Sequence, residues 1–144
     1  MRQLIIVRKD LNMSVGKTAV QCCHASQAWL MEKIKNASHF CIYRVDFITD
    51  IAINCRIMEE WVNDIQKKTI CGAKNKTQLM KVVTMAQELG LKENKDFFLI
   101  YDRCLTELVP EEQDESGGKT LTCIGFRPLD DDIVHKISKK YQLL

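Results

Sequence analysis

The sequence has no long hydrophobic run. No stretch of about 18 consecutive apolar residues occurs, so we expect no transmembrane helix. The apolar run near the start, Leu4 to Val7, is too short to form the hydrophobic region of a secretory signal. These two absences favour a cytoplasmic protein without a membrane partner.

The chain also lacks an excess of charge of either sign. Its 21 basic and 19 acidic residues give a formal net charge of +2, which excludes binding to nucleic acid through overall charge alone. Contact with RNA would need a local basic patch, for which the candidates are Lys67, Lys68, Lys74 and Lys76. A solvated charged surface explains these four lysines equally well.

No C-x-x-C pair occurs among the seven cysteines, and their number is odd. This pattern argues against a structural zinc site and against a disulfide framework. Most of the cysteines lie within apolar runs, so we expect reduced, buried thiols in a cytoplasmic protein. We expect neither a metal nor a cofactor.

Hydrophobic periodicity divides the chain into alternating strands and helices. Strands are expected at 3–8, 68–73, 96–101 and 119–125, and helices at 16–35, 45–65, 75–90 and 130–139. The third helix has Asn75 as its N-cap, Gln78 as the capping-box partner and Gly90 after its last turn.

This order predicts an α/β fold in a single domain over residues 1–144. The last two strands are joined by a loop and not by a helix, which favours an antiparallel pair in a mixed sheet. We therefore expect a three-layer α/β/α sandwich around a small four-stranded mixed sheet.

Residues 8–25 form the most informative segment, because three polar side chains recur in it at helical spacing. Lys17, Gln21 and His24 stand at i, i+4 and i+7, which places them on one face of a helix. That helix would begin soon after a short buried strand. Free N–H groups near Gly16 and the positive end of the helix dipole then suit an anion.

The same segment contains part of a nucleotide-binding loop, but not all of it. Gly16-Lys17-Thr18 matches the end of G-x-x-x-x-G-K-[ST], whereas the position of the first glycine holds Leu11. A nucleotide hydrolase is therefore disfavoured, while an anion site at the start of the helix stays open.

The segment resembles the opening motif of the archaeal and eukaryotic, second type of peptidyl-tRNA hydrolase, R-x-D-L-x-M-x-x-G-K-x-A-x-Q-C-x-H-A. The matching residues are Arg8, Asp10, Leu11, Met13, Gly16, Lys17, Ala19, Gln21, Cys22, His24 and Ala25. Later segments around Trp61, Leu89-Gly90-Leu91 and Ile124-Gly125 extend the resemblance over nearly the whole chain. It implies a mixed sheet between helices, a homodimer, and peptidyl-tRNA as the substrate.

Two regions depart from the family pattern. The first is an insertion at about 37–57, for which a partner is one explanation. The second is the segment that in the family reads D-A-G-R-T-Q-I-A-P-G. It keeps Asp102, Thr106 and Pro110 but holds Leu105 in place of an arginine. Losing a cation near a phosphate-rich ligand weakens binding, unless the loop turns so that Arg103 takes its place.

The resemblance implies water attack on the ester between a peptide and the 3′ ribose of tRNA. Such a reaction needs a positioned water, an oxyanion stabiliser and a proton path. The catalytic candidates are Lys17 for the oxyanion or a 3′-end phosphate, Asp102 to orient Lys17 or the water, Thr106 to hold water or ribose, and His24 for proton transfer. The candidates for binding the substrate are Arg8, Gly16, Gln21, Lys68 and Lys76.

Each of these residues also has a purely structural explanation. Lys17 could be a solvated lysine, His24 a hydrogen-bonded structural residue, and Asp102 the cap of a turn. Arg8 and Asp10 could form a supporting ion pair. For the whole chain, the alternative to a hydrolase is a non-catalytic module that binds RNA or protein, in keeping with the altered loop and the insertion.

Overall fold

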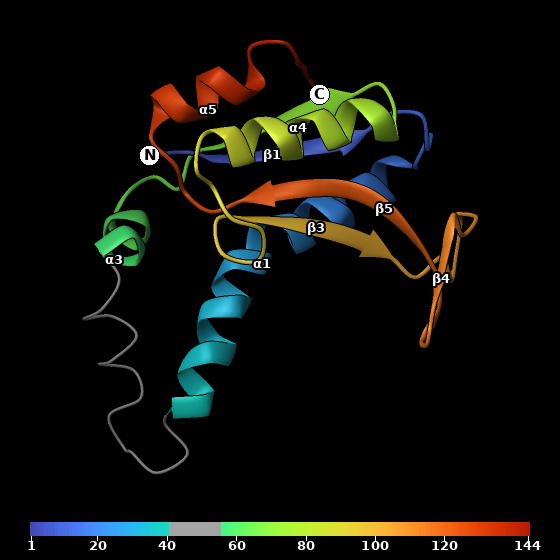
Figure 1. Cartoon of the computed structure of the whole chain (residues 1–144), viewed down its shortest axis with the longest axis horizontal. Helices are drawn as coiled ribbons and strands as arrows, with labels where there is room; N and C mark the ends of the chain where they lie inside the picture. Colours follow the sequence, from blue (N-terminus) through green and yellow to red (C-terminus); the bar gives the residue numbers. More distant parts are fainter. Residues whose placement is uncertain (41–55) are drawn as a thin grey trace.

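The computed structural model describes residues 1–40 and 56–144 (Figure 1). Along the chain the elements are β1 (Gln3–Arg8), α1 (Val15–Phe40), α3 (Arg56–Asn63), β2 (Lys68–Ala73), α4 (Lys76–Glu88), β3 (Phe97–Asp102), β4 (Glu112–Asp114), β5 (Gly117–Phe126), α5 (Asp131–Ser138) and β6 (Gln142–Leu143). Only the end of the helix expected at 45–65 falls within the described residues, as α3. The insertion expected at 37–57 lies largely outside them.

The sheet is mixed, as the sequence predicts. Its order is β3-β5-β1-β2-β6, with β4 paired to β5. The β1 and β2 strands are parallel, whereas β5 runs antiparallel to both β1 and β3. The antiparallel pairing expected for the strands at 96–101 and 119–125 is therefore confirmed.

The prediction of four strands is wrong, because the described sheet has six. The two additional strands are β4, within the segment expected to be a loop, and β6, next to the C-terminus. They have three and two residues, and their burial pattern is exposed or intermediate. Strands of this kind pair through their backbones and show no apolar alternation, so periodicity could not reveal them.

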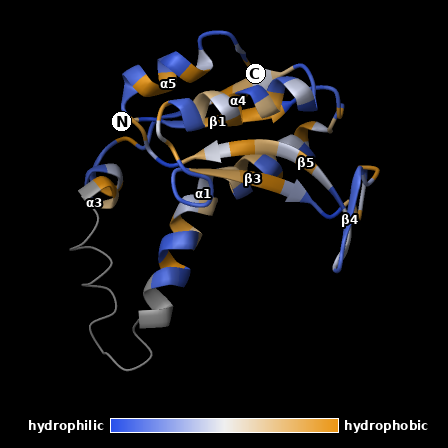
Figure 2. Cartoon of the chain, viewed as in Figure 1, coloured by the Kyte–Doolittle hydropathy of each residue, from blue (hydrophilic) through white to orange (hydrophobic). Residues whose placement is uncertain are grey.

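Strand β1 lies in the middle of the core and is buried along its whole length. Leu4 and Ile6 pack with residues of α4 and α5, whereas Ile5 and Val7 pack with Cys22 and Ala25 of α1. Successive side chains of a strand point to opposite faces, so β1 brings helices to both faces of the sheet. The strong hydrophobic colouring of the sheet contrasts with the hydrophilic β4 hairpin at its end (Figure 2).

Helix α1 begins one residue before the expected start and extends five residues beyond the expected end, from Val15 to Phe40. It packs tightly on β5 at Gly125, where an added Cβ would lie 2.3 Å from the carbonyl oxygen of Ala25. Glycine at this position permits the close approach, which fixes how the first turns of α1 stand relative to β3 and β5. Further along, Trp29 of α1 packs with Met58 and Trp61 of α3.

The expected caps of α4 are present in modified form. Asn75 accepts a hydrogen bond from the Gln78 N–H at 2.9 Å, and Gly90 adopts a φ of 80° after the helix. The Gln78 side chain accepts from the N–H of Lys74. The reciprocal contact of the capping box is thus displaced by one residue.

Three of the cysteines that the structure describes, Cys22, Cys71 and Cys123, are buried, as expected for reduced thiols. Cys23 is exposed and Cys104 is partly exposed. Among the described helices, none combines the length and the apolar character needed to cross a membrane.

Candidate active site

The candidate site lies at the edge of the sheet where β1, β2 and β3 end. These three strands run in the same direction, so Arg8, Ala73 and Asp102 all stand at this edge. Helix α1 begins here because the chain turns back directly after β1. The topology thus joins residues of the opening motif to the segment that follows β3.

An ion pair between Lys17 and Asp102 forms the centre of the site. The Lys17 Nζ lies 2.6 Å from Asp102 Oδ2, and the two side chains are 16% and 10% exposed. The sequence places these residues 85 positions apart, and the prediction is that Asp102 orients either Lys17 or the attacking water. The structure brings the two side chains into direct contact.

Asp102 is held from two other directions. Gln21 Nε2 donates to Asp102 Oδ2 at 2.9 Å, and the Cys104 N–H donates to Oδ1 at 2.8 Å. Burial by itself raises the pKa of Asp102, but the hydrogen bonds from Lys17 and Cys104 outweigh it, and the pKa is lowered. The carboxylate is therefore ionised at neutral pH.

Gln21 is buried beneath the ion pair and is itself oriented by β5. The Thr122 hydroxyl lies 2.7 Å from Gln21 Oε1 and donates to it. This contact directs the amide nitrogen of Gln21 toward Asp102. Sequence reasoning missed Thr122, because the face to which a residue of β5 points depends on strand register.

Thr106 completes the cluster from the segment after β3. Its Oγ1 lies 3.3 Å from Lys17 Nζ, which donates to it. A lysine ammonium carries three N–H donors, and here two of them reach Asp102 and Thr106. The third can stabilise an anion. We call Lys17, Gln21, Asp102, Thr106 and Thr122 the Lys17 cluster.

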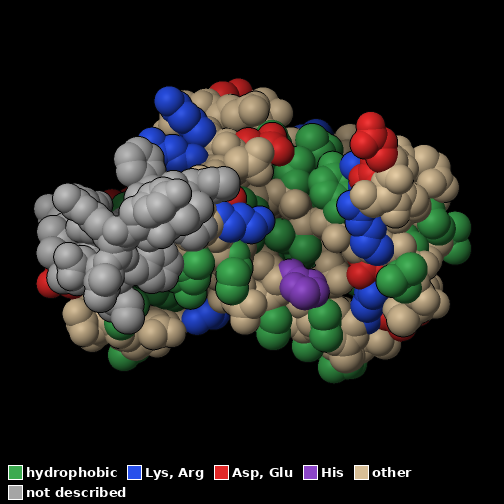
Figure 3. Space-filling view, turned by 90° about the horizontal axis from the view of Figure 1, so that it is seen from below, with side chains coloured by type: hydrophobic (Ala, Val, Ile, Leu, Met, Phe, Trp, Pro, Cys, Tyr) green, Lys and Arg blue, Asp and Glu red, His purple; other side chains and the backbone are tan. Residues whose placement is uncertain are grey.

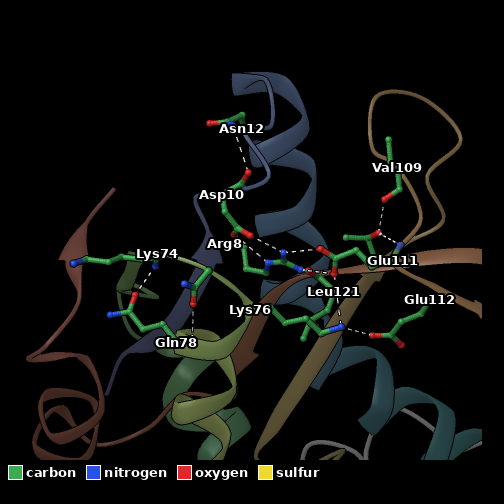
Figure 4. A network of polar contacts seen from close by, with 12 residues as sticks. Arg8, Asp10, Asn12, Lys74, Lys76, Gln78, Val109, Glu111, Glu112 and Leu121 are labelled. Atoms are coloured by element: carbon green, nitrogen blue, oxygen red, sulfur yellow. Dashed lines mark hydrogen bonds and ion pairs between the residues drawn. The ribbon is translucent and has the colours of Figure 1, made fainter.

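Arg8 lies at the same edge but in a second network (Figure 4). Its guanidinium contacts both oxygens of Asp10 and both oxygens of Glu111, and it donates to the Leu121 carbonyl. These contacts use all five N–H donors of an arginine. The side chain is 3% exposed, and the hydrogen bond to Glu111 raises its pKa further above the usual range.

Lys76, the first residue of α4, extends this second network. Its Nζ lies 2.6 Å from Glu112 and 3.7 Å from Glu111. The hydrogen bond to Glu112 raises the pKa of Lys76. We call Arg8, Asp10, Lys76, Glu111 and Glu112 the Arg8 network. The expected ion pair between Arg8 and Asp10 is part of it, whereas Glu111, 103 residues from Arg8, was missed.

Two further candidates, Gly16 and His24, lie on α1. Gly16 is exposed in the first turn, with open space where a Cβ would stand. His24 is exposed too. It lies seven residues beyond Lys17, about 10 Å along the helix axis. No hydrogen bond joins it to the Lys17 cluster within the described part of the chain.

The four lysines around β2 do not form one basic patch. Lys68 lies over the Trp61 ring and donates to the Gln66 carbonyl, and Lys67 pairs with Asp131. Lys74 and Lys76 stand beyond the other end of β2, about 20 Å away along a six-residue strand. On the face seen from below, basic side chains likewise occur in separate groups (Figure 3).

Arg103 does not take the place of the missing family arginine. Its Nη1 contacts both oxygens of Asp114 in β4, at 2.8 and 2.9 Å, and within the described residues no contact joins it to the Lys17 cluster. The hydrogen bond from Arg103 helps to lower the pKa of Asp114 to about 2. The lost cation near Thr106 is thus not replaced by its neighbour in sequence.

Within residues 1–40 and 56–144, no group of three His, Cys, Asp or Glu side chains is arranged to hold a metal ion. The chemistry that the Lys17 cluster can support is that of a charged amine, a carboxylate and a hydroxyl.

Comparison with known proteins places the chain in a family. The model of the family described as peptidyl-tRNA hydrolase PTH2 matches residues 1–144. The chain belongs to the PTH2 family of peptidyl-tRNA hydrolases. Proteins of this family are hydrolases that act on ester bonds.

Curated relatives named peptidyl-tRNA hydrolase match nearly end to end. One from Methanopyrus kandleri is 31% identical over 144 residues, covering 99% of this chain and 97% of the relative. Those from Thermoplasma acidophilum and Methanothermobacter thermautotrophicus are each 28% identical, over 143 and 144 residues. They cover 99% and 100% of this chain, and 97% and 100% of the relatives. This chain thus matches these three relatives over nearly their full length.

Proposed function

We propose that this protein is a peptidyl-tRNA hydrolase that releases tRNA by water attack on the ester between a peptide, or a blocked aminoacyl group, and the 3′ ribose. Membership in the PTH2 family and the relatives of that name support the reaction. The observation that carries the proposal is the ion pair at the start of α1, in which Lys17 Nζ lies 2.6 Å from Asp102 Oδ2. One N–H donor of Lys17 is not used by its contacts and can bind a ligand.

Lys17 stabilises the negative charge that develops on the ester carbonyl oxygen. Its ammonium is fixed by Asp102 and Thr106 before the substrate arrives, so little reorganisation is needed as charge develops. The free N–H groups in the first turn of α1, around Gly16, favour the same charge. The N-terminus of α1 can also bind a second anion, the phosphate at the 3′ end of the tRNA.

Asp102 holds Lys17 and orients the attacking water. A carboxylate has about four acceptor positions, and three are used here by Lys17, Gln21 and the Cys104 N–H. The remaining position, on Oδ1, can accept a hydrogen bond from water. Because the Thr106 oxygen accepts from Lys17, its hydroxyl hydrogen is free to donate to the ribose or to a second water.

The other candidates take different parts in this proposal. Gln21 supports Asp102, and Arg8 stabilises the edge of the sheet without touching the substrate, since its N–H donors are fully used. We leave His24 and Lys68 out of the reaction because they lie away from the Lys17 cluster. Lys76 stays a candidate for contact with RNA, because its side chain is 40% exposed and one N–H is unused by Glu111 and Glu112.

Several broader features remain part of the proposal. We take residues 1–144 as one domain, the layers as α1 against one face of the sheet and α4 with α5 against the other, and the location as cytoplasmic. A homodimer is also proposed. Light scattering would give a mass of twice 16.6 kDa if the homodimer is right.

The reaction is tested with a blocked aminoacyl-tRNA as the substrate. Free tRNA should accumulate with the wild-type protein and should be lost in Lys17→Ala and Asp102→Ala. An inactive wild-type protein that is folded and still binds RNA would favour the non-catalytic module. Equal activity of both variants and the wild type would place the chemistry elsewhere.

A further inference from the structure

The segment between β3 and β4 reaches back to the start of α1 through Glu107. Glu107 Oε1 accepts from the Ser14 N–H at 3.2 Å and from the Ser14 hydroxyl at 3.0 Å. Ser14 Oγ in turn accepts from the N–H of Lys17 at 3.1 Å, as the N-cap of α1. One carboxylate oxygen is therefore joined through Ser14 to the backbone of Lys17.

This contact stands directly beside the one made by Thr106. Adjacent residues reach the same turn of α1: Glu107 to Ser14 and Thr106 to the side chain of Lys17. The preceding residue contributes little packing, since Leu105 is 88% exposed. Within the described residues, Glu107 is the nearest hydrogen-bonded anchor to Thr106.

We infer that Glu107 is a positioning residue, which holds Thr106 against Lys17 by tying the segment 103–108 to Ser14. The inference rests on the proposed function for its catalytic consequence. A carboxylate is well placed at a helix N-terminus because of the helix dipole. The contact itself needs only an acceptor oxygen, which glutamine also supplies.

Kinetics of Glu107→Ala and Glu107→Gln separate positioning from a general structural role. Glu107→Ala should lower kcat about tenfold, because a misplaced hydroxyl at the reacting centre slows the reaction more than it weakens binding. KM for the blocked aminoacyl-tRNA should stay within about twofold, and Glu107→Gln should restore kcat to within about twofold of wild type. Glu115→Ala, an exposed glutamate beyond β4, is the matched control and should be unchanged.

A double-mutant cycle with Ser14→Ala tests whether Glu107 acts through Ser14. The double variant should be less slow than the product of the two single effects, because Ser14→Ala already removes the hydroxyl contact and leaves Glu107 only the backbone N–H. Multiplied effects of the two substitutions would overturn the inference. A Glu107→Gln variant as slow as Glu107→Ala would also overturn it, as would a change in KM alone.

Hydrogen exchange gives a test that is independent of hydrolysis. Amides in 103–108 and in the first turn of α1 should exchange faster in Glu107→Ala than in wild type, and at the wild-type rate in Glu107→Gln. An inactive wild-type protein would contradict the proposed function, and exchange would still decide the inference. Equal exchange in all three proteins would contradict the tie to Ser14.

Discussion

The Lys17 cluster and the Arg8 network are two charged groups at the same edge of one sheet, and they differ in what they leave free. Arg8 is 3% exposed, and its guanidinium donates hydrogen bonds to two carboxylates and a carbonyl. Lys17 is 16% exposed and keeps one N–H donor beyond its contacts with Asp102 and Thr106. The Arg8 guanidinium is saturated, whereas the Lys17 ammonium has capacity for a ligand.

This difference separates a structural role from a binding role better than residue type does. Both cations belong to the opening motif, and both are candidates for substrate contact on sequence grounds. A buried arginine whose donors are all used cannot bind a phosphate without breaking its ion pairs, which costs several kcal/mol. The structure therefore favours Lys17 for chemistry and Arg8 for stability.

The largest effect on stability is expected from Arg8→Met. Removing the guanidinium leaves Asp10 and Glu111 facing each other, so the free energy of unfolding should fall by about 3 kcal/mol, as measured by urea denaturation. Lys76→Ala, which breaks a more exposed pair of the same network, should cost less than about 1 kcal/mol. If the two variants were equally stable, Arg8 would not hold this edge of the sheet.

Asp102→Asn should have the next largest effect, on catalysis. The change keeps the shape of the side chain but removes the charge that holds Lys17, so kcat should fall about 100-fold with blocked aminoacyl-tRNA. Circular dichroism should show an unchanged fold. A variant with wild-type kcat would remove Asp102 from the reaction and weaken the contrast between the two groups.

Acid should weaken both groups. Hydrogen bonding to Arg8 lowers the pKa of Glu111 from the usual 4.5, and the contacts of Asp102 lower its pKa from the usual 3.8. A lowered carboxyl pKa stabilises the fold fully above the unfolded value. That stability is lost as pH falls through the folded value.

The free energy of unfolding should therefore begin to fall near pH 4.5 and continue to fall below pH 3.8. Urea denaturation across this range measures it, and Glu111→Gln should flatten the upper part of the curve. Stability that stays constant down to pH values below both ordinary pKa values would contradict the two ionised pairs.

The smallest effects are expected from His24→Ala and Lys68→Ala. His24 is exposed beyond the Lys17 cluster and Lys68 stands at the opposite end of β2, so each variant should keep kcat within about twofold. A tenfold loss in His24→Ala would assign it the proton transfer that the sequence suggests. For Lys68→Ala, a raised KM with a weaker salt dependence would instead show contact with RNA.

Sequence patterns predict those parts of the fold that depend on apolar burial. Strands β1 and β2 begin and end where expected, because their apolar runs are distinct. Strands β4 and β6 could not be found in this way, since they pair by backbone contacts. Lys67, Lys68, Lys74 and Lys76 lie close together in the sequence, but the length of β2 separates them into two pairs in the structure.

For the candidate site, the resemblance suggests that Asp102 acts on Lys17, and the structure contains a direct contact between the two side chains. Contacts that depend on register or loop path could not be predicted. Thr122 points to Gln21 because of the register of β5, and Glu111 reaches Arg8 because the segment after β3 folds back along β5. The same loop path determines the contact of Glu107 with Ser14.

The single-turnover rate of hydrolysis of blocked aminoacyl-tRNA, compared per folded molecule in Lys17→Ala and Arg8→Lys, tests the central claim most directly. The rate in Lys17→Ala should fall about 100- to 1000-fold, since a donor to the oxyanion is lost. In Arg8→Lys it should stay within about threefold of wild type even though the protein unfolds more easily. Equal losses in the two variants, or a greater loss in Arg8→Lys, would contradict the division between a catalytic cluster and a structural network.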